Sequence, residues 1–304
     1  MKNNDSIHIA NYCISFIDLL GQRLKYKDEG ILPKFESPKD KAKFIDKIKH
    51  TVAPIDDLQR SSSQFLESSL DYKSPLRKEL PPELHPVYDK MHEVKLRQQR
   101  WSDGLVYFVF LLEGNVECPM AGVYKLFVST GCLCFLGLGK KQPLRGSIDI
   151  AWGVELHDGE LYGAAVAKAY ELESYVAQYP RIVVGQRALD YLITNIKNPA
   201  SDIYSEFNRQ LAQICLSILT LDSDGYHIVH YLGDSFKNFV SKGLHPKLYQ
   251  EALKYLSEQC EKWHLEKNTK LSLRYNHLYS YFLAHSPDNP LEIDAQPAAA
   301  RDGA

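Results

Sequence analysis

Two aspartates, each next to a glycine and an apolar run, have the residue types and spacing of a site for divalent metal ions. Asp18 lies near the end of the apolar run 14–20, which Gly21 closes, and Asp103-Gly104 directly precedes the apolar run 105–112. A carboxylate beside a buried strand is costly unless a cation receives it. Carboxylates together with substrate phosphates are the usual ligands of Mg²⁺, and Mn²⁺ prefers the same oxygen donors. The alternative is that each aspartate only caps a turn or a helix.

The elements that must position these aspartates follow from hydrophobic periodicity. We expect strands at 14–20, 105–112, 144–153 (with a hairpin turn at 157–160), 181–184 and 221–231. Helices are expected at 40–70, 87–96, 120–138, 164–175, 185–195, 202–219, 246–265 and 270–284, and Pro54 should break or kink the first of them. This order predicts an α/β fold, an α+β sandwich in which helices cover one mixed sheet.

Composition bounds the organisation of the chain. Its 304 residues suit one large domain with an appendage, which we place as a core at 8–195, a C-terminal strand and helical extension at 196–285, and a disordered tail at 286–304. A formal net charge of −2 offers no general attraction to nucleic acid or to a membrane surface. We expect no signal peptide and no membrane span, and therefore a cytoplasmic protein.

Cysteine and histidine usage argues against zinc and disulfides. The six cysteines form no CxxC pair and lie mostly in apolar stretches, which favours buried reduced thiols. The eleven histidines show neither HxH nor HExxH spacing, so a zinc site is not expected.

Four short motifs, in this order, resemble class III nucleotide cyclases. The motifs are Phe16-Ile17-Asp18-Leu19-Leu20-Gly21, Ser102-Asp103-Gly104, Arg145-Gly146-Ser147-Ile148 and the segment 161–173 that begins Leu161-Tyr162-Gly163. Together with Tyr179-Pro180-Arg181-Ile182-Val183-Val184 they are most similar to the bacterial Pycsar branch, the pyrimidine cyclases of anti-phage defence. The resemblance covers about residues 8–240. Each motif is weak alone, and the specificity lies in their order and spacing.

The resemblance implies a cyclase-like palm domain, a homodimer with active sites at the subunit interface, and attack of the substrate's 3′-hydroxyl on its own α-phosphate. It assigns two Mn²⁺ or Mg²⁺ ions to Asp18 and Asp103, with the carbonyl of Ile17 or Leu19 as a further ligand. The ions would lower the pKa of the hydroxyl and neutralise the triphosphate. It also implies that three backbone amides hold the phosphates, those of Leu20, Gly21 and Gln22.

The sequence departs from the purine cyclases of this class at the positions that stabilise the transition state and read the base. Ala167 and Glu171 stand where those enzymes carry an asparagine and an arginine. Another cation must therefore act, and we take Arg145 as the catalytic candidate; the alternatives are Arg181, Arg23, Lys168 and Arg100. By offset, Gln99 and Glu160 would read the base, and the glutamine amide suits a pyrimidine edge.

Three functions remain open on the sequence alone. The first is a pyrimidine nucleotide cyclase that makes cyclic UMP or cyclic CMP from UTP or CTP as a second messenger. The second is an inactive cyclase-like module that binds a nucleotide or a partner protein. The third is a palm-like nucleotidyltransferase, which the near-neutral charge disfavours because a polymer substrate needs a basic groove. The sequence predicts that Glu171 and Glu173 form a solvated helix end. It leaves open the role of the C-terminal helices, from which Arg274, Lys262 and Lys267 could reach a phosphate.

Overall fold

The computed structural model describes residues 9–21, 30–68, 78, 80–91, 94, 96–101, 103–111, 118–157, 159–199, 201–240 and 245–286. The predicted tail beyond residue 286 lies outside the described residues.

The fold is a mixed α/β fold built on one sheet of eight strands. The strands are β1 (Ile9–Leu19), β2 (Arg97–Trp101), β3 (Gly104–Phe110), β4 (Leu144–His157), β5 (Glu160–Tyr162), β6 (Ile182–Val184), β7 (Leu219–Leu221) and β8 (His227–Val229). They run in the order β2-β3-β1-β4-β6-β8-β7, and β5 pairs with β4. Strands β4 and β6 are parallel, and the other described pairs are antiparallel.

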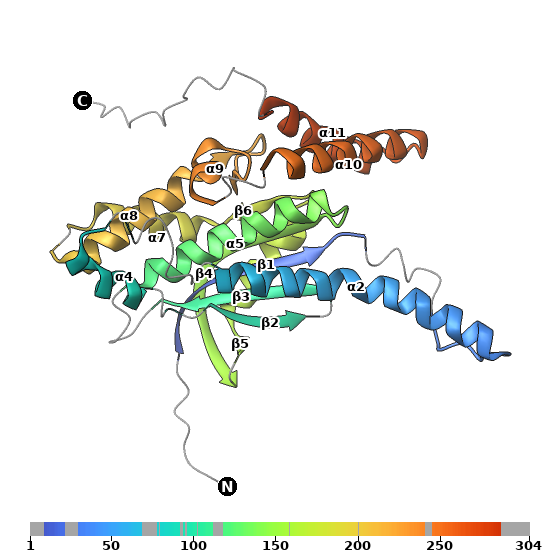
Figure 1. Ribbon diagram of the computed structural model, residues 1–304, viewed down its shortest axis with the longest axis horizontal. Coiled ribbons are helices and arrows are strands. Elements are labelled where there is room, and N and C mark those ends of the chain that lie inside the picture. Colours follow the sequence, from blue (N-terminus) through green and yellow to red (C-terminus); the bar gives the residue numbers. More distant parts are fainter. Residues whose placement is uncertain are drawn as a thin grey trace, which may run out of the picture.

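Helices surround this sheet (Figure 1). They are α2 (Pro38–Ser68), the 3₁₀ turn η1 (Pro82–Leu84), α4 (His85–Met91), α5 (Pro119–Gly139), α6 (Ala164–Glu171), the π-helical turn η2 (Leu172–Val176), α7 (Gln186–Lys197), α8 (Ile203–Ser217), α9 (Asp234–Val240), α10 (His245–Leu265) and α11 (Thr269–Ala284).

Strand alternation gives the sheet two buried faces. On β1, Cys13, Ile17 and Leu19 point into the larger core, which α5, α7, α8, α10 and α11 complete. The intervening side chains, among them Ile14 and Phe16, point to the opposite face, where α6 packs on β1 and β4. Because side chains alternate along a strand, the single register of β1 decides which residues face α6.

Helix α5 is the central helix of the larger core. A Cβ added at Gly122 would lie 2.3 Å from Val109 Cγ2 of β3, so a glycine is needed for this close approach. The helix is long and apolar enough to cross a membrane, contrary to our expectation that no segment would be, but 83% of its most apolar window is buried inside the fold. Burial of this kind is typical of a core helix.

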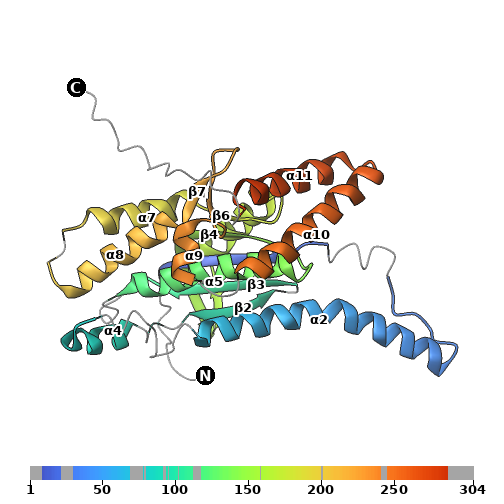
Figure 2. The same cartoon turned by 45° about the horizontal axis from the view of Figure 1, so that its top comes forward.

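The C-terminal segment contributes to the same sheet and core. Strands β7 and β8 pair beside β6, and α10 and α11 lie together over α5 (Figure 2). The boundary that we expect at residues 195/196 stays a prediction.

The structure corrects three expectations about elements. Helix α2 continues through Pro54 as one element of 31 residues, so a break there is wrong. The polar segment Arg97–Trp101 forms the edge strand β2, which we did not predict. Helix α9 was also missed.

The described cysteines are free, and five of the six are buried, which confirms reduced thiols.

Candidate functional site

One row of residues crosses four neighbouring strands at the end of β1. Asp18 pairs with Gly104 of β3 on one side and with Arg145 of β4 on the other, and Trp101 of β2 pairs with Gly104. Directly paired residues point to the same face, and Asp18 is two residues beyond Phe16, which is buried under α6. The row therefore lies on the α6 face of the sheet and brings the predicted acid and the predicted cation together.

Gly104 makes this row close-packed. A Cβ added there would lie 3.1 Å from the Ile17 carbonyl oxygen, 3.3 Å from that of Trp101 and 3.5 Å from Phe16 Cε1. A glycine at this position therefore lets the neighbouring strands approach each other closely.

Asp103 lies in the turn that joins β2 to β3, one residue before Gly104, and is partly exposed. Because Gly104 is paired with Asp18, the two aspartates lie at the same end of adjacent antiparallel strands. The structure thus brings together the two predicted metal-binding acids at the backbone level. The Ile17 carbonyl oxygen faces the same glycine.

Arg145 is shared between two carboxylates. Its Nη2 lies 3.4 Å from Asp18 Oδ2, and its Nε lies 2.5 Å from Glu173 Oε1. The side chains of Arg145 and Asp18 retain 20% and 24% of their exposure, whereas that of Glu173 retains 2%. Arg145 therefore has one buried partner and one partner that a ligand could reach.

Glu173 is the clearest error among our expectations for single residues. The structure buries it to 1% exposure in η2, where Ser174 Oγ donates a hydrogen bond to Oε2 at 2.8 Å. The prediction of a solvated helix end holds for Glu171, which is exposed and pairs with Lys168 at 2.7 Å, and is wrong for Glu173. Its charged partner Arg145 is distant in sequence, so local sequence does not indicate that this carboxylate is buried.

Of the three backbone amides predicted to bind phosphate, the structure describes those of Leu20 and Gly21. The Leu20 amide donates to the Pro143 carbonyl at 3.0 Å, so a phosphate would have to replace that hydrogen bond. Gly21 turns the chain with a positive φ of 87°. Gln22 lies outside the described residues, as does Arg23. The Leu19 side chain points into the larger core, on the face opposite to Asp18.

The two predicted base-reading residues come close together. The Leu161 amide donates to Gln99 Oε1 at 3.1 Å, and Leu161 directly follows Glu160. Gln99 pairs with Val106, which pairs with Phe16, so Gln99 is in the next row on the same face as Asp18. This hydrogen bond fixes the glutamine carbonyl and directs its amide NH₂ as a donor toward any neighbouring group.

Two partly exposed aromatic side chains border this site and were missed in the sequence. Phe16 contacts Trp101 edge-on at a ring-centroid distance of 6.2 Å and Tyr170 of α6 at 5.5 Å. Trp101 and Tyr170 each keep 44% exposure. An aromatic ring with a free edge or face is suited to contact a planar base.

The structure gives the remaining candidate cations different partners. Arg181 is 3% exposed and bound to two aspartates, so it has a structural role. Lys168 pairs with Glu171, and both line a pocket of about 320 Å³ with Asp149 and Tyr175. Arg100 lies 3.8 Å from Asp56. Of the candidates within the described residues, Arg145 is the one that contacts a predicted metal-binding acid.

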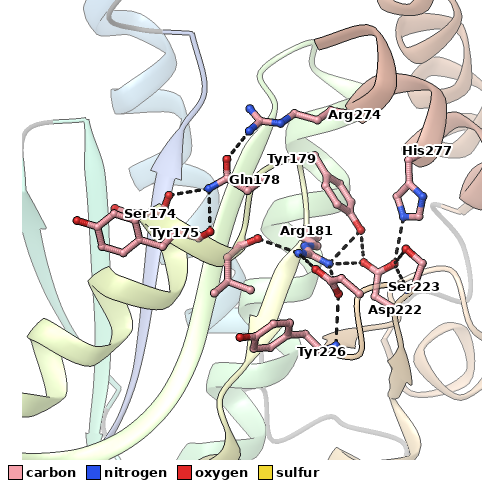
Figure 3. A network of polar contacts seen from close by, with 12 residues as sticks. Ser174, Tyr175, Gln178, Tyr179, Arg181, Asp222, Ser223, Tyr226, Arg274 and His277 are labelled. Atoms are coloured by element: carbon pink, nitrogen blue, oxygen red, sulfur yellow. Dashed lines mark hydrogen bonds and ion pairs between the residues drawn. The ribbon is translucent and has the colours of Figure 1, made fainter. Parts of the chain in front are cut away.

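Arg181 organises a network between β6, the β7–β8 turn and α11 (Figure 3). Its guanidinium lies 2.5 Å from both Asp222 and Asp224, and Val176 O accepts a further hydrogen bond at 2.8 Å. His277 Nε2 lies 3.0 Å from Asp222 Oδ1. Burial acts to raise the pKa of Asp222, but hydrogen bonds from Tyr179, the Ser223 amide and Arg181 together hold this pKa below its ordinary value.

The predicted donor set for divalent ions consists of two carboxylates, those of Asp18 and Asp103. Within the described part of the chain, no group of three or more His, Cys, Asp and Glu side chains lies together as a metal site. Mg²⁺ seldom needs such a group, because one or two carboxylates with water and substrate phosphates suffice. Asp18 on the row and Asp103 in the adjoining turn are carboxylates of the kind that such an ion would need.

The sequence matches no protein-family model, and the search of curated proteins finds no similar sequence. The geometry of the site therefore carries the functional argument.

Proposed function

We propose that this chain is a pyrimidine nucleotide cyclase, which converts UTP or CTP to the 3′,5′-cyclic nucleotide and pyrophosphate. The observation that carries the proposal is the row in which Asp18 lies between Gly104 and Arg145, with Asp103 in the adjoining turn. It supports the proposal because acids that can hold cations and an arginine beside them are what an intramolecular phosphoryl transfer requires.

In this reaction the 3′-oxygen forms a bond to the α-phosphorus, and the bond from that phosphorus to the pyrophosphate oxygen breaks. The 3′-hydroxyl proton is lost to solvent or to a nearby base. Divalent ions held by Asp18 and Asp103, with the Ile17 or Leu19 carbonyl, would lower the pKa of this hydroxyl and neutralise the triphosphate. Arg145 would donate to the α-phosphate oxygens, where negative charge increases in the transition state.

Arg145 is suited to this role because Glu173 keeps it in place. If Asp18 held cations and substrate, Arg145 would lose one carboxylate and retain the buried one. The retained pair fixes the direction of the guanidinium, so that little reorganisation is needed when the charge develops.

The row of residues that contains Gln99 supports a pyrimidine as the base of the substrate. The Gln99 carbonyl is fixed by the Leu161 amide, which leaves its NH₂ as a donor for a carbonyl oxygen on the base. Trp101 and Tyr170 offer partly exposed rings on the same face. The choice between UTP and CTP stays open.

We further propose that two copies of the chain meet on this side of the sheet and complete the active sites. Two aromatic side chains are exposed there, Trp101 and Tyr170, each at 44%. Exposed aromatic residues are enriched in protein interfaces. The cyclic product would act in the cytoplasm as a signal in antiviral defence.

An inactive cyclase-like module is the second candidate. It is favoured by Ala167 and Glu171, which cannot replace the asparagine and arginine of the purine enzymes, and by the ion pair that occupies Asp18. Such a module would bind a nucleotide without converting it.

Product formation distinguishes the two candidates. Purified protein is incubated with each of the four nucleoside triphosphates and Mn²⁺, and the products are identified by mass. We expect cyclic UMP or cyclic CMP from the wild type, and a loss of at least about 100-fold in rate for Asp18→Asn and for Asp103→Asn.

The matched control is Asp46→Asn, which removes an exposed carboxylate from α2 and should keep the wild-type rate. An enzyme that forms no cyclic nucleotide from any of the four substrates, while still binding one of them, supports the inactive module and refutes the cyclase.

A further inference from the structure

The C-terminal helix α11 directs an arginine toward the site. Arg274 is half-buried, and its Nη2 donates a hydrogen bond to Gln178 Oε1 (Figure 3). The amide of Gln178 donates in turn to the carbonyl oxygens of Ser174 and Tyr175, both at 2.9 Å. The guanidinium is therefore tied to the end of η2, although it comes from a helix nearly 100 residues further along the chain.

The same turn holds Arg145. Glu173, which pairs with Arg145 Nε, directly precedes Ser174 in η2. One turn of the chain thus fixes Arg145 through a carboxylate and Arg274 through a glutamine. Burial and, after it, the positive charge of Arg145 lower the pKa of Arg274.

Arg274 has no carboxylate partner of its own within the described part of the chain. Arg145 faces Asp18 and Glu173, and Arg181 faces Asp222 and Asp224, whereas no ion pair among the described residues includes Arg274. Its hydrogen-bond acceptor Gln178 is neutral. A guanidinium with only a neutral acceptor can bind an anionic ligand, and arginines bind phosphate oxygens through their planar donors.

We infer that Arg274 and Arg145 together bind the polyphosphate of the nucleotide, with Arg274 as a substrate-binding residue supplied by the C-terminal helix. The inference rests on the proposed function and deepens it, because it gives the helical extension a role at the same site. Gln178 is a positioning residue that orients Arg274.

Calorimetric titration of the full chain with inorganic tripolyphosphate in Mg²⁺ tests this inference. We expect Arg274→Gln to raise the dissociation constant about tenfold or more, since an ionic hydrogen bond to phosphate is lost. Arg274→Lys should recover part of the affinity, because the charge remains while the planar donor pair is lost.

Lys270→Gln is the matched control, because it removes the same charge from an exposed position in the first turn of α11. Gln178→Ala should weaken binding less than Arg274→Gln and should cause no further loss in the double variant, since it acts through Arg274. Thermal unfolding of each variant shows that the fold is kept.

The outcomes separate this inference from the proposed function. Equal dissociation constants for Arg274→Gln and Lys270→Gln, or no binding of tripolyphosphate by the wild type, overturn the inference. If the wild type makes a cyclic nucleotide and Arg274→Gln leaves its KM unchanged, the inference fails while the cyclase stands. If no cyclic product forms but binding depends on Arg274, the polyphosphate site stands without the cyclase.

Discussion

At the scale of single residues, the position of Arg145 between an accessible and a buried carboxylate decides how the site can work. Asp18 is a partner that a cation or a nucleotide can compete for, and Glu173 is not. An arginine with a permanent buried partner stays ordered when the other partner is taken by a ligand. Under the proposed function, this arrangement would replace the asparagine and arginine that are absent at Ala167 and Glu171.

Comparison of the wild type with a single and a double variant tests the buried pair. Arg145→Gln should lower the free energy of unfolding by about 3 kcal/mol, because it leaves the Glu173 carboxylate buried without its cation. The double variant Arg145→Gln/Glu173→Gln should recover most of this loss, since no buried charge remains. Urea unfolding at pH 7 measures all three values.

If Arg145→Gln and the double variant are equally destabilised, Glu173 does not depend on Arg145. The pairing described above would then be wrong.

His230 predicts a dependence of stability on pH. Its Nδ1 lies 2.7 Å from the Tyr281 hydroxyl, and burial, followed by the charges of His285 and Lys237, lowers the pKa of His230 from 6.5 to about 3. Below pH 6.5 the unfolded chain binds a proton that the folded chain does not accept until about pH 3. Stability is therefore lost as the pH falls through this window, by about 1 kcal/mol between pH 7 and pH 5.5.

The measurement compares the free energy of unfolding of the wild type and His230→Asn at both pH values. The asparagine variant should lose about 1 kcal/mol less than the wild type over this interval. Equal losses would show that His230 titrates alike in the folded and unfolded chains.

At the scale of elements, the Arg181 network connects β6, the β7–β8 turn and α11 in one cluster of charges (Figure 3). Arg181 and Asp222 are 41 residues apart in sequence, and His277 is a further 55 residues along the chain. The network therefore fixes the C-terminal helix, and with it Arg274, relative to the sheet.

The two acids of this network should differ in their effect on stability. The Asp222 side chain is 6% exposed and that of Asp224 is 43% exposed. Asp222→Asn should cost about 3 kcal/mol, because it removes one partner of a buried ion pair. Asp224→Asn should cost at most about 1 kcal/mol, as for other exposed pairs.

Chemical denaturation of the two single variants provides this comparison. Similar costs for Asp222 and Asp224 would mean that burial does not set the strength of these pairs.

The difference between local patterns and contacts with distant partners explains which elements could be predicted from the sequence. Strand β1 and helix α5 follow from apolar patterns that their own residues carry. Strand β2 could not be found this way, because Arg97–Trp101 is polar and forms an edge strand only where β3 pairs with it. Glu173 and Arg181 look like surface charges in sequence, since their partners are distant.

For the site, Asp18, Asp103 and Arg145 could be predicted because each stands in a local motif. Trp101, Tyr170 and Gln178 could not, because their positions follow from the register of β2 and the placement of α6 and η2. Local sequence motifs identify the residues at the ends of strands. The residues around them can be identified only from the packing of the folded chain.

At the scale of the whole molecule, the C-terminal helices are part of the core. Phe282 of α11 and Tyr249 of α10 are fully buried in the cluster that also contains Phe135 of α5. Removing these helices would expose a large apolar surface that no other described element could cover.

A chain truncated after residue 240 should therefore fail to fold cooperatively. We expect its thermal unfolding, followed by circular dichroism, to lack the sharp transition of the full chain. A truncated chain with a sharp transition near the wild-type Tm would show that the extension is dispensable for folding.

The most direct test of the cyclase proposal is the product made from an equimolar mixture of the four nucleoside triphosphates with Mn²⁺, resolved by chromatography and identified by mass. We expect one dominant product, cyclic UMP or cyclic CMP, from the wild type and none from Asp18→Asn. A mixture that returns only unchanged triphosphates, or a cyclic product that Asp18→Asn forms equally well, would contradict the account.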